Sequence, residues 1–180
     1  MLRERVIGSA AADRAAAFTD LAERHLADSY RTATLILGDR ADAEDATHDA
    51  FVAAWKHWSS LRDPDRFEAW FGRILVNTCR DRLRHARRHP VTDVSGELVA
   101  DPATGDVATV TADRDAVGQA LAGLDPDHRI VLVLRYYADL PVDEIAARTG
   151  VPAGTVKSRL HYALRDLGAA LGDGRPEVTR

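Results

Sequence analysis

The chain has 180 residues, of which 46 % are hydrophobic and 6 % aromatic, and its formal net charge is −4. Its one cysteine, Cys79, excludes an internal disulfide and favours a reducing cytoplasm. No stretch approaches the roughly 18 consecutive apolar residues of a membrane span, and the N-terminus has no signal-peptide pattern, so we expect neither feature.

The first half of the chain predicts helices with clear start signals. Residues 10–37 have the pattern of one or two helices that end near Gly38. A second helix is expected over 39–59, because Asp39 can cap its N-terminus and acidic residues fill its first turns. The pair Asp63-Pro64 is a further start signal, and the helix that it opens should run to about Arg88.

The second half begins with a segment of different character. Residues 90–110 hold two prolines and two glycines without a helical period, so we read them as a linker. Helical patterning resumes at about residue 111, restarts at Asp125-Pro126, and ends with two short helices separated by Gly150. The sequence therefore predicts an all-α protein with two small helical domains, 1–89 and 111–180, joined by a flexible acidic linker. It leaves open whether the domains lie apart or pack together.

A basic segment stands out against the negative net charge. Residues 73–89 hold six arginines and one aspartate, a net charge of +5. At 100° per residue, one face of about 80° gathers the following side chains: Arg73, Asn77, Arg80, Arg84 and Arg87. Arginine suits phosphates, and an asparagine can read a base edge. Phe67 and Trp70, at the upstream end, could stack on an unpaired base. The alternative is an ordinary solvated arginine face.

The two C-terminal helices have the pattern of a helix-turn-helix. In the second of them, Val156, Leu160, Leu164 and Leu167 form an apolar stripe of about 80° that should pack on the partner helix. The opposite side and flanks present hydrogen-bond donors to the major groove: Thr155, Lys157, Ser158, Arg159, His161, Tyr162 and Arg165. A helical hairpin with a solvated face remains the alternative.

The acidic helix over 39–59 carries carboxylates ahead of its aromatic residues. Its carboxylates are Asp42, Glu44, Asp45 and Asp49, and with His48 they form no known metal-ligand signature. The aromatic residues Phe51, Trp55 and Trp58 follow i, i+4, i+7 and should pack in a core. We therefore expect no metal, no cofactor and no enzyme activity.

These three segments, in this order, resemble a bacterial extracytoplasmic-function (ECF) sigma factor, and the resemblance runs from about Phe18 to Leu171. It implies a protein that binds core RNA polymerase and promoter DNA and is restrained by an anti-sigma factor. The first domain would recognise and melt the −10 element, and the second would read the −35 element. An isolated DNA-binding protein with this negative charge would be poorly served by long-range electrostatics, whereas a polymerase subunit need not be basic.

The resemblance also implies residue roles. Contacts to the −10 element would come from Ser60, Arg62, Phe67, Trp70, Arg73, Asn77, Arg80 and Arg84. Contacts to the −35 element would come from Thr155, Lys157, Ser158, Arg159, His161, Tyr162 and Arg165. The polymerase clamp would be met by Asp42, Glu44, Asp45, Asp49 and Phe51.

Two other functions compete with this one. A stand-alone helix-turn-helix repressor or activator would bind DNA as a dimer and would need neither the acidic helix nor the helix of Asn77. An enzyme built on the carboxylates and histidine of residues 39–59 would need a second cluster of chemical groups, and the sequence supplies none.

Overall fold

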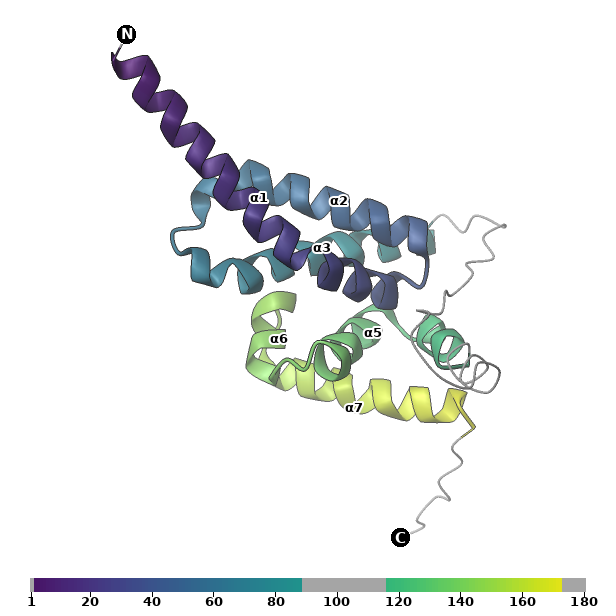
Figure 1. Cartoon of the computed structure of the whole chain (residues 1–180). Helices are drawn as coiled ribbons and strands as arrows, with labels where there is room; N and C mark the ends of the chain where they lie inside the picture. Colours follow the sequence, from purple (N-terminus) through teal and green to yellow (C-terminus); the bar gives the residue numbers. More distant parts are fainter. Residues whose placement is uncertain (1, 89–115, 173–180) are drawn as a thin grey trace, which may run out of the picture.

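The computed structural model describes residues 2–88 and 116–172, and the side chains from residue 13 onward. Over these ranges the chain is helical and contains no strand, which confirms the predicted all-α class. Figure 1 shows two layers: α1, α2 and α3 form one, and α5, α6 and α7 lie beneath it. We call residues 2–88 the first unit and residues 116–172 the second unit. The predicted linker, 90–110, lies outside the described residues.

The first unit is a bundle of three long helices. Helix α1 spans Leu2–Leu37, α2 spans Arg40–His57 and α3 spans Phe67–Arg88, with the short 3-10 turns Trp58–Ser60 and Pro64–Arg66 between the last two. Helix α1 is one continuous helix that starts earlier than predicted, and Gly38 after it has a φ of 77°. That left-handed conformation costs glycine little, and it allows the reversal into α2.

Both predicted caps of the first unit are present. Asp39 accepts a hydrogen bond from the Asp42 amide at 2.8 Å, and Asp63 accepts one from the Asp65 amide at 3.1 Å. Each carboxylate satisfies a backbone donor that the helix itself leaves unpaired. The second start signal opens a 3-10 turn, however, and α3 proper begins only at Phe67.

The second unit consists of three short helical segments, a π-helical segment and the longer helix α7. Residues 116–123 are helical, α5 spans Pro126–Leu132, α6 spans Val142–Thr149 and α7 spans Ala153–Ala170. The segment Val133–Tyr137 continues α5 as a π-helix, η3, which the sequence pattern did not reveal. Gly150, with a φ of 72°, makes the turn between α6 and α7. The predicted helix-turn-helix is therefore present.

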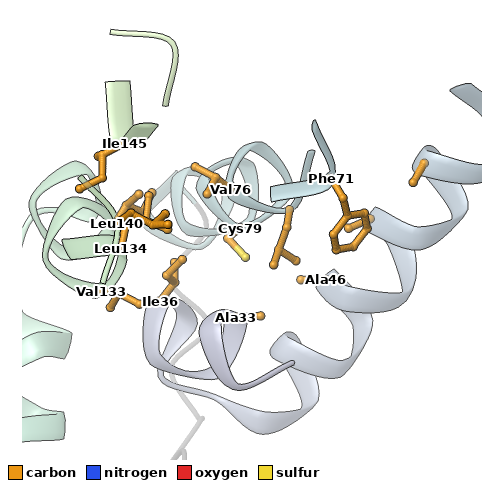
Figure 2. Close-up of a cluster of buried hydrophobic side chains, with 14 of the residues drawn as sticks. Ala33, Ile36, Ala46, Phe71, Val76, Cys79, Val133, Leu134, Leu140 and Ile145 are labelled. Atoms are coloured by element: carbon orange, nitrogen blue, oxygen red, sulfur yellow. The ribbon is translucent and has the colours of Figure 1, made fainter. Parts of the chain in front are cut away.

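The hydrophobic core continues from one unit into the other. Figure 2 shows Ile36, Val76 and Cys79 of the first unit facing a group from the second. That group consists of Val133, Leu134, Leu140 and Ile145, each at most 8 % exposed. Because apolar surface from both units is removed from water at this seam, the hydrophobic effect favours the packed arrangement.

Candidate nucleic-acid interface

The basic face of α3 is present, but its members differ in exposure. Arg73, Asn77 and Arg84 are exposed, as a surface for DNA requires. Arg80 lies on the side toward the second unit, and its side chain is only 12 % exposed. The predicted arginine face is thus partly open to solvent and partly covered.

Arg80 is held by three groups. Its Nε donates to Asp127 Oδ1 at 3.0 Å, and its Nη1 donates to the Thr149 carbonyl at 3.2 Å and to Asn77 Oδ1 at 3.3 Å. Asp127 lies in the first turn of α5 and Thr149 is the last residue of α6. Two of the three contacts therefore join the first unit to the second.

Arg87 makes a second connection between the units. Its Nη1 donates to Asp125 Oδ2 at 3.0 Å, and its Nη2 donates to the Leu124 carbonyl at 3.4 Å. Asp125 also caps α5 by accepting from the Asp127 amide at 2.9 Å. Partial burial acts to raise the pKa of Asp125, but this amide and the Arg87 guanidinium outweigh it and hold the pKa below its usual value.

The predicted DNA-reading face of α7 is largely exposed. Lys157, Ser158, His161, Tyr162 and Arg165 are exposed, and Thr155 is half-buried. The Arg165 guanidinium lies 5.0 Å from the centre of the Tyr162 ring, so these two side chains form a cation–π pair.

Arg159 differs from its neighbours on α7. Its Nη2 donates to Asp127 Oδ2 at 2.8 Å, and its side chain is 22 % exposed. The same carboxylate therefore binds Arg80 from the first unit through one oxygen and Arg159 from the second unit through the other.

The predicted apolar stripe of α7 contained Leu164, but in the structure its neighbour Ala163 takes that place in the core. Leu164 is 45 % exposed, whereas Ala163 is fully buried beside Leu160 and Leu167. On a helix, position 163 lies 20° from position 156 and position 164 lies 80° from it, so Leu164 falls at the edge of the stripe. The prediction left out Ala163 because alanine occurs on both buried and exposed faces of helices.

The entrance to α3 combines a pocket with a buried aromatic cluster. Ser60, Arg62 and Trp70 line a pocket of about 390 Å³ that α6 borders through Glu144 and Ala147. Ser60 and Arg62 are exposed and Trp70 is half-buried, so all three are available to a ligand in this pocket.

Phe67 has a different environment from the one that a base-stacking role needs. It is 1 % exposed and lies 5.5 Å, between ring centroids, from Phe71 and 5.9 Å from Trp58. A ring that is surrounded by other rings offers no free face to a base, which corrects its assignment as a DNA contact. Phe67 lies about one helical turn before Trp70, so the two were given the same role. Helical periodicity does not show which ring of an aromatic cluster is buried and which is exposed.

The acidic helix α2 presents its carboxylates to solvent, with an arginine among them. Arg82 of α3 lies 2.7 Å from Asp49, 3.6 Å from Asp42 and 3.7 Å from Asp45. This accounts for Arg82, which departs from the amphipathic pattern of α3: it holds α2 and α3 in register. Glu44 is exposed as well.

The aromatic residues of α2 are only partly in the core. Trp58 is buried, and Phe51 stacks on Phe71 at 4.3 Å between ring centroids while remaining half-exposed. Trp55 is 43 % exposed and touches the Phe18 ring with its edge, at 5.2 Å. The prediction of core packing was therefore wrong for Trp55, and α2 offers an exposed indole beside its carboxylates.

Three charged residues at the junction of the units were missed by the sequence reading: Asp127, Arg129 and Arg148. Arg129 is 6 % exposed and donates to the Ile36 carbonyl at 3.0 Å, at the end of α1. Arg148 lies between Glu144 at 2.7 Å and Glu68 of the first unit at 3.0 Å. No local pattern in the sequence identifies Arg129 as buried, because arginine is usually exposed and its carbonyl partner Ile36 is distant in the chain.

The comparisons with known proteins agree with this architecture. The family model described as Sigma-70 region 2 matches residues 21–89, and that described as Sigma-70, region 4 matches residues 120–168. The ECF RNA polymerase sigma factor SigL of Mycobacterium tuberculosis is 38 % identical over 167 residues, covering 91 % of this chain and 93 % of the relative. The chain belongs to the ECF RNA polymerase sigma factors. The RNA polymerase sigma-E factor of Streptomyces avermitilis is 34 % identical over 137 residues, 76 % of this chain and 75 % of that protein.

Solved structures share the fold. The sigma factor RpoE of Bartonella quintana, in complex with the anti-sigma factor NepR, gives a TM-score of 0.67 at 25 % identity and covers 88 % of this chain and 98 % of that one. CnrH, in complex with the cytosolic domain of CnrY, gives 0.62 at 29 % identity, with 87 % and 88 % covered. The predicted sigma-factor function, promoter recognition with RNA polymerase, is confirmed at the level of the family.

Two further findings concern the described residues alone. None of their helices is long and apolar enough to cross a membrane. Nor do residues 2–88 and 116–172 hold a group of three or more His, Cys, Asp or Glu side chains placed for a metal ion.

Proposed function

We propose that the first unit of this sigma factor opens the −10 element and the second unit reads the −35 element, each mainly through its own DNA-facing helix. The observation that carries this proposal is the pair of donor-rich faces, on α3 and on α7, in units that match Sigma-70 regions 2 and 4. The protein acts in the cytoplasm as a polymerase subunit without catalytic activity of its own.

On α3, the exposed Arg73 and Arg84 bind phosphates and Asn77 binds a base edge. Phosphate contacts fix the position of a protein on DNA, and contacts to base edges carry its specificity. The pocket lined by Ser60, Arg62 and Trp70 is where an unstacked base of the −10 element is received.

On α7, Lys157, Ser158 and His161 read bases in the major groove. Thr155, Arg159 and Arg165 bind the flanking phosphates, with Tyr162 beside Arg165. Each side chain except Arg159 and Thr155 is already exposed, so docking of α7 requires rearrangement only at these two positions.

On α2, Asp42, Glu44, Asp45 and Asp49 bind the polymerase clamp together with the exposed edge of Phe51. Apolar surface beside a charged rim is typical of a protein–protein interface, and Trp55 adds to the apolar part. An anti-sigma factor is a second protein partner, a proposal supported by RpoE, a similar structure solved with an anti-sigma factor.

Run-off transcription tests the function as a whole. The purified protein is added to bacterial core RNA polymerase on a pool of genomic promoter fragments. We expect new, discrete start sites that require the protein and share two upstream elements. Sequence-specific DNA binding without any transcript would instead favour the stand-alone repressor or activator.

Single substitutions test the residue roles. Asn77→Ala should impair promoter opening more than polymerase binding, and Lys157→Ala or Ser158→Ala should relax the −35 preference. Arg24→Ala is the control, because Arg24 is an exposed arginine of α1 outside all three faces. Loss of polymerase affinity alone in Asn77→Ala would contradict the role given to α3, and an unchanged −35 preference would contradict the role given to α7.

The polymerase contact needs a charge reversal. Changing Asp45 and Asp49 to lysine should weaken holoenzyme formation in gel filtration, both because the clamp contact is lost and because Arg82 then meets like charges. Arg82→Gln separates the two effects: it disturbs the same internal pairs and leaves the carboxylates exposed. Intact holoenzyme in the double variant would contradict the clamp contact.

A further inference from the structure

Two of the predicted DNA-phosphate contacts already have an anionic partner inside the molecule. Asp127 accepts from Arg80 Nε at 3.0 Å through Oδ1 and from Arg159 Nη2 at 2.8 Å through Oδ2. Arg80 belongs to the −10 face and Arg159 to the −35 face. A carboxylate held between two guanidinium groups has the chemistry that a DNA phosphate would offer to them.

A second carboxylate makes a similar contact about two turns of α3 further along. Asp125 Oδ2 accepts from Arg87 Nη1 at 3.0 Å. Arg87 lies on the same predicted face of α3 as Arg80. Both carboxylates lie at the N-terminus of α5, where the helix dipole favours negative charge.

The remainder of the seam brings α6 against α3. Gly72 allows this approach, because a Cβ at this position would lie 2.7 Å from Arg148 Nη1 and 3.0 Å from its Cζ. Arg148 in turn reaches Glu68 of α3 at 3.0 Å. As a result Glu144 and Ala147 of α6 border the pocket of Ser60, Arg62 and Trp70 in which we place an unstacked base.

We propose that the packed arrangement is an autoinhibited state of the free protein, in which the carboxylates of Asp127 and Asp125 occupy the places of DNA phosphates on Arg80, Arg159 and Arg87. This inference rests on the proposed function, because it takes the arginine faces of α3 and α7 as the DNA-binding faces. DNA and the carboxylates compete for the same guanidinium groups, and the carboxylates compete at the high effective concentration of an intramolecular group. Binding both promoter elements therefore requires the two units to separate.

The seam predicts which changes open the molecule. Asp127→Asn removes the charge that both arginines share and keeps an amide oxygen as acceptor. Asp125→Asn removes the charge facing Arg87 and keeps the helix cap, since asparagine caps as well as aspartate. Gly72→Ala changes no charge: it places a methyl group against Arg148, while alanine is the better helix former within α3.

Asp139→Asn is the matched control. Asp139 lies in the second unit, its side chain is 96 % exposed, and it forms an ion pair with Arg135 of its own unit at 3.5 Å. Its φ of 49° suits asparagine, so this variant changes the net charge by the same amount as either single substitution at the seam, without strain.

The first measurement is compactness, by small-angle X-ray scattering of the full chain without polymerase or DNA. The wild-type protein and Asp139→Asn should be compact, and the double variant Asp125→Asn/Asp127→Asn and Gly72→Ala should be more extended. The second measurement is the affinity of the same proteins for a short mixed-sequence DNA duplex at fixed salt. We expect the double variant to bind about three- to tenfold tighter than the wild type, and the control to differ by less than about twofold.

The outcomes separate this inference from the proposed function. Equal compactness of all variants, or a gain in DNA affinity no larger than that of Asp139→Asn, would overturn the autoinhibited state. Run-off transcription with core polymerase tests the function independently. If transcription fails while the variants still expand, the proposed function is wrong but the packed conformation of the free protein is supported. If transcription succeeds and no variant expands, the proposed function is supported and the autoinhibited state is wrong.

Discussion

Arg129 couples the two units, and replacing it with methionine should destabilise both. Its guanidinium is buried and donates to the Ile36 carbonyl at 3.0 Å and to the Ala122 carbonyl at 2.5 Å, with a longer contact to Leu37 at 3.5 Å. The first and last of these carbonyls end α1, where a helix leaves acceptors unpaired. Arg129 therefore caps a helix of the other unit.

The magnitude follows from opposing effects. Each hydrogen bond from a charged donor contributes about 1.5–3 kcal/mol, and Arg129→Met leaves two or three buried carbonyls without a partner. In the opposite direction, methionine avoids the free-energy cost of burying a charged group. That cost is visible in the pKa of Arg129, which burial and then the nearby Arg87 lower. We expect a net loss of about 2–4 kcal/mol in the free energy of unfolding.

The tryptophans make the coupling measurable. All three, Trp55, Trp58 and Trp70, lie in the first unit, so their fluorescence reports on that unit although the substitution is in the second. In urea unfolding, Arg129→Met should lower the midpoint seen by fluorescence as well as that seen by circular dichroism. Arg135→Met is the control, because Arg135 is bonded within its own unit to the Leu140 carbonyl. An unchanged fluorescence midpoint in Arg129→Met would refute the coupling.

The remaining predictions concern the core and the pH dependence. Burial raises the pKa of the Cys79 thiol to about 12, so a thiol reagent at mildly alkaline pH should label Cys79 only after urea unfolds the chain; rapid labelling of the folded protein would contradict its place in the core. Ala163→Leu should lower the free energy of unfolding by about 1–3 kcal/mol through overpacking, whereas Leu164→Ala should change the urea midpoint little because Leu164 is 45 % exposed. A larger effect of Leu164→Ala than of Ala163→Leu would instead support the apolar stripe that the sequence predicts. The pKa of Asp125 is lowered by folding, so its contribution to the closed state is present above its ordinary value of 3.8 and is lost as the pH falls below it. Scattering during acidification should therefore show expansion in this range, and the expansion should depend less on pH in Asp125→Asn.

The helices could be predicted because their signals are local. Asp39 and Asp63 cap residues two or three positions away, and Gly150 turns the chain by its own backbone conformation. Such interactions are complete within a few residues, so the sequence contains both partners side by side. The early start of α1 and the π-helical segment η3 were not predicted, because neither has a local start or stop signal of this kind in the sequence.

The contacts between the units could not be predicted in the same way. Arg80 and Asp127 are 47 residues apart, and Arg129 and Ile36 are 93 apart. A sequence pattern identifies Arg80 as a cation on a polar face, but it does not say whether that face meets DNA, water or a carboxylate of the same chain. The role of Phe67 was predicted wrongly for a related reason: its place on the helix was right, but the rings of Phe18 in α1 and Trp58 in the preceding 3-10 turn enclose it.

The closed state also gives a physical meaning to the acidic balance of the chain. The apparent dissociation constant of a two-state protein for DNA is its intrinsic value divided by the fraction of open molecules, so a closed state favoured about a hundredfold weakens DNA binding about a hundredfold. A partner that binds α2 and holds the units apart removes this penalty without touching DNA. By linkage the effect is reciprocal. Polymerase binds less tightly to the closed protein because part of its binding free energy is used to separate the units, and it binds more tightly when DNA already holds them apart. The carboxylates of Asp125 and Asp127 would thus make promoter binding conditional on the polymerase, which a permanently basic DNA-binding surface would not do.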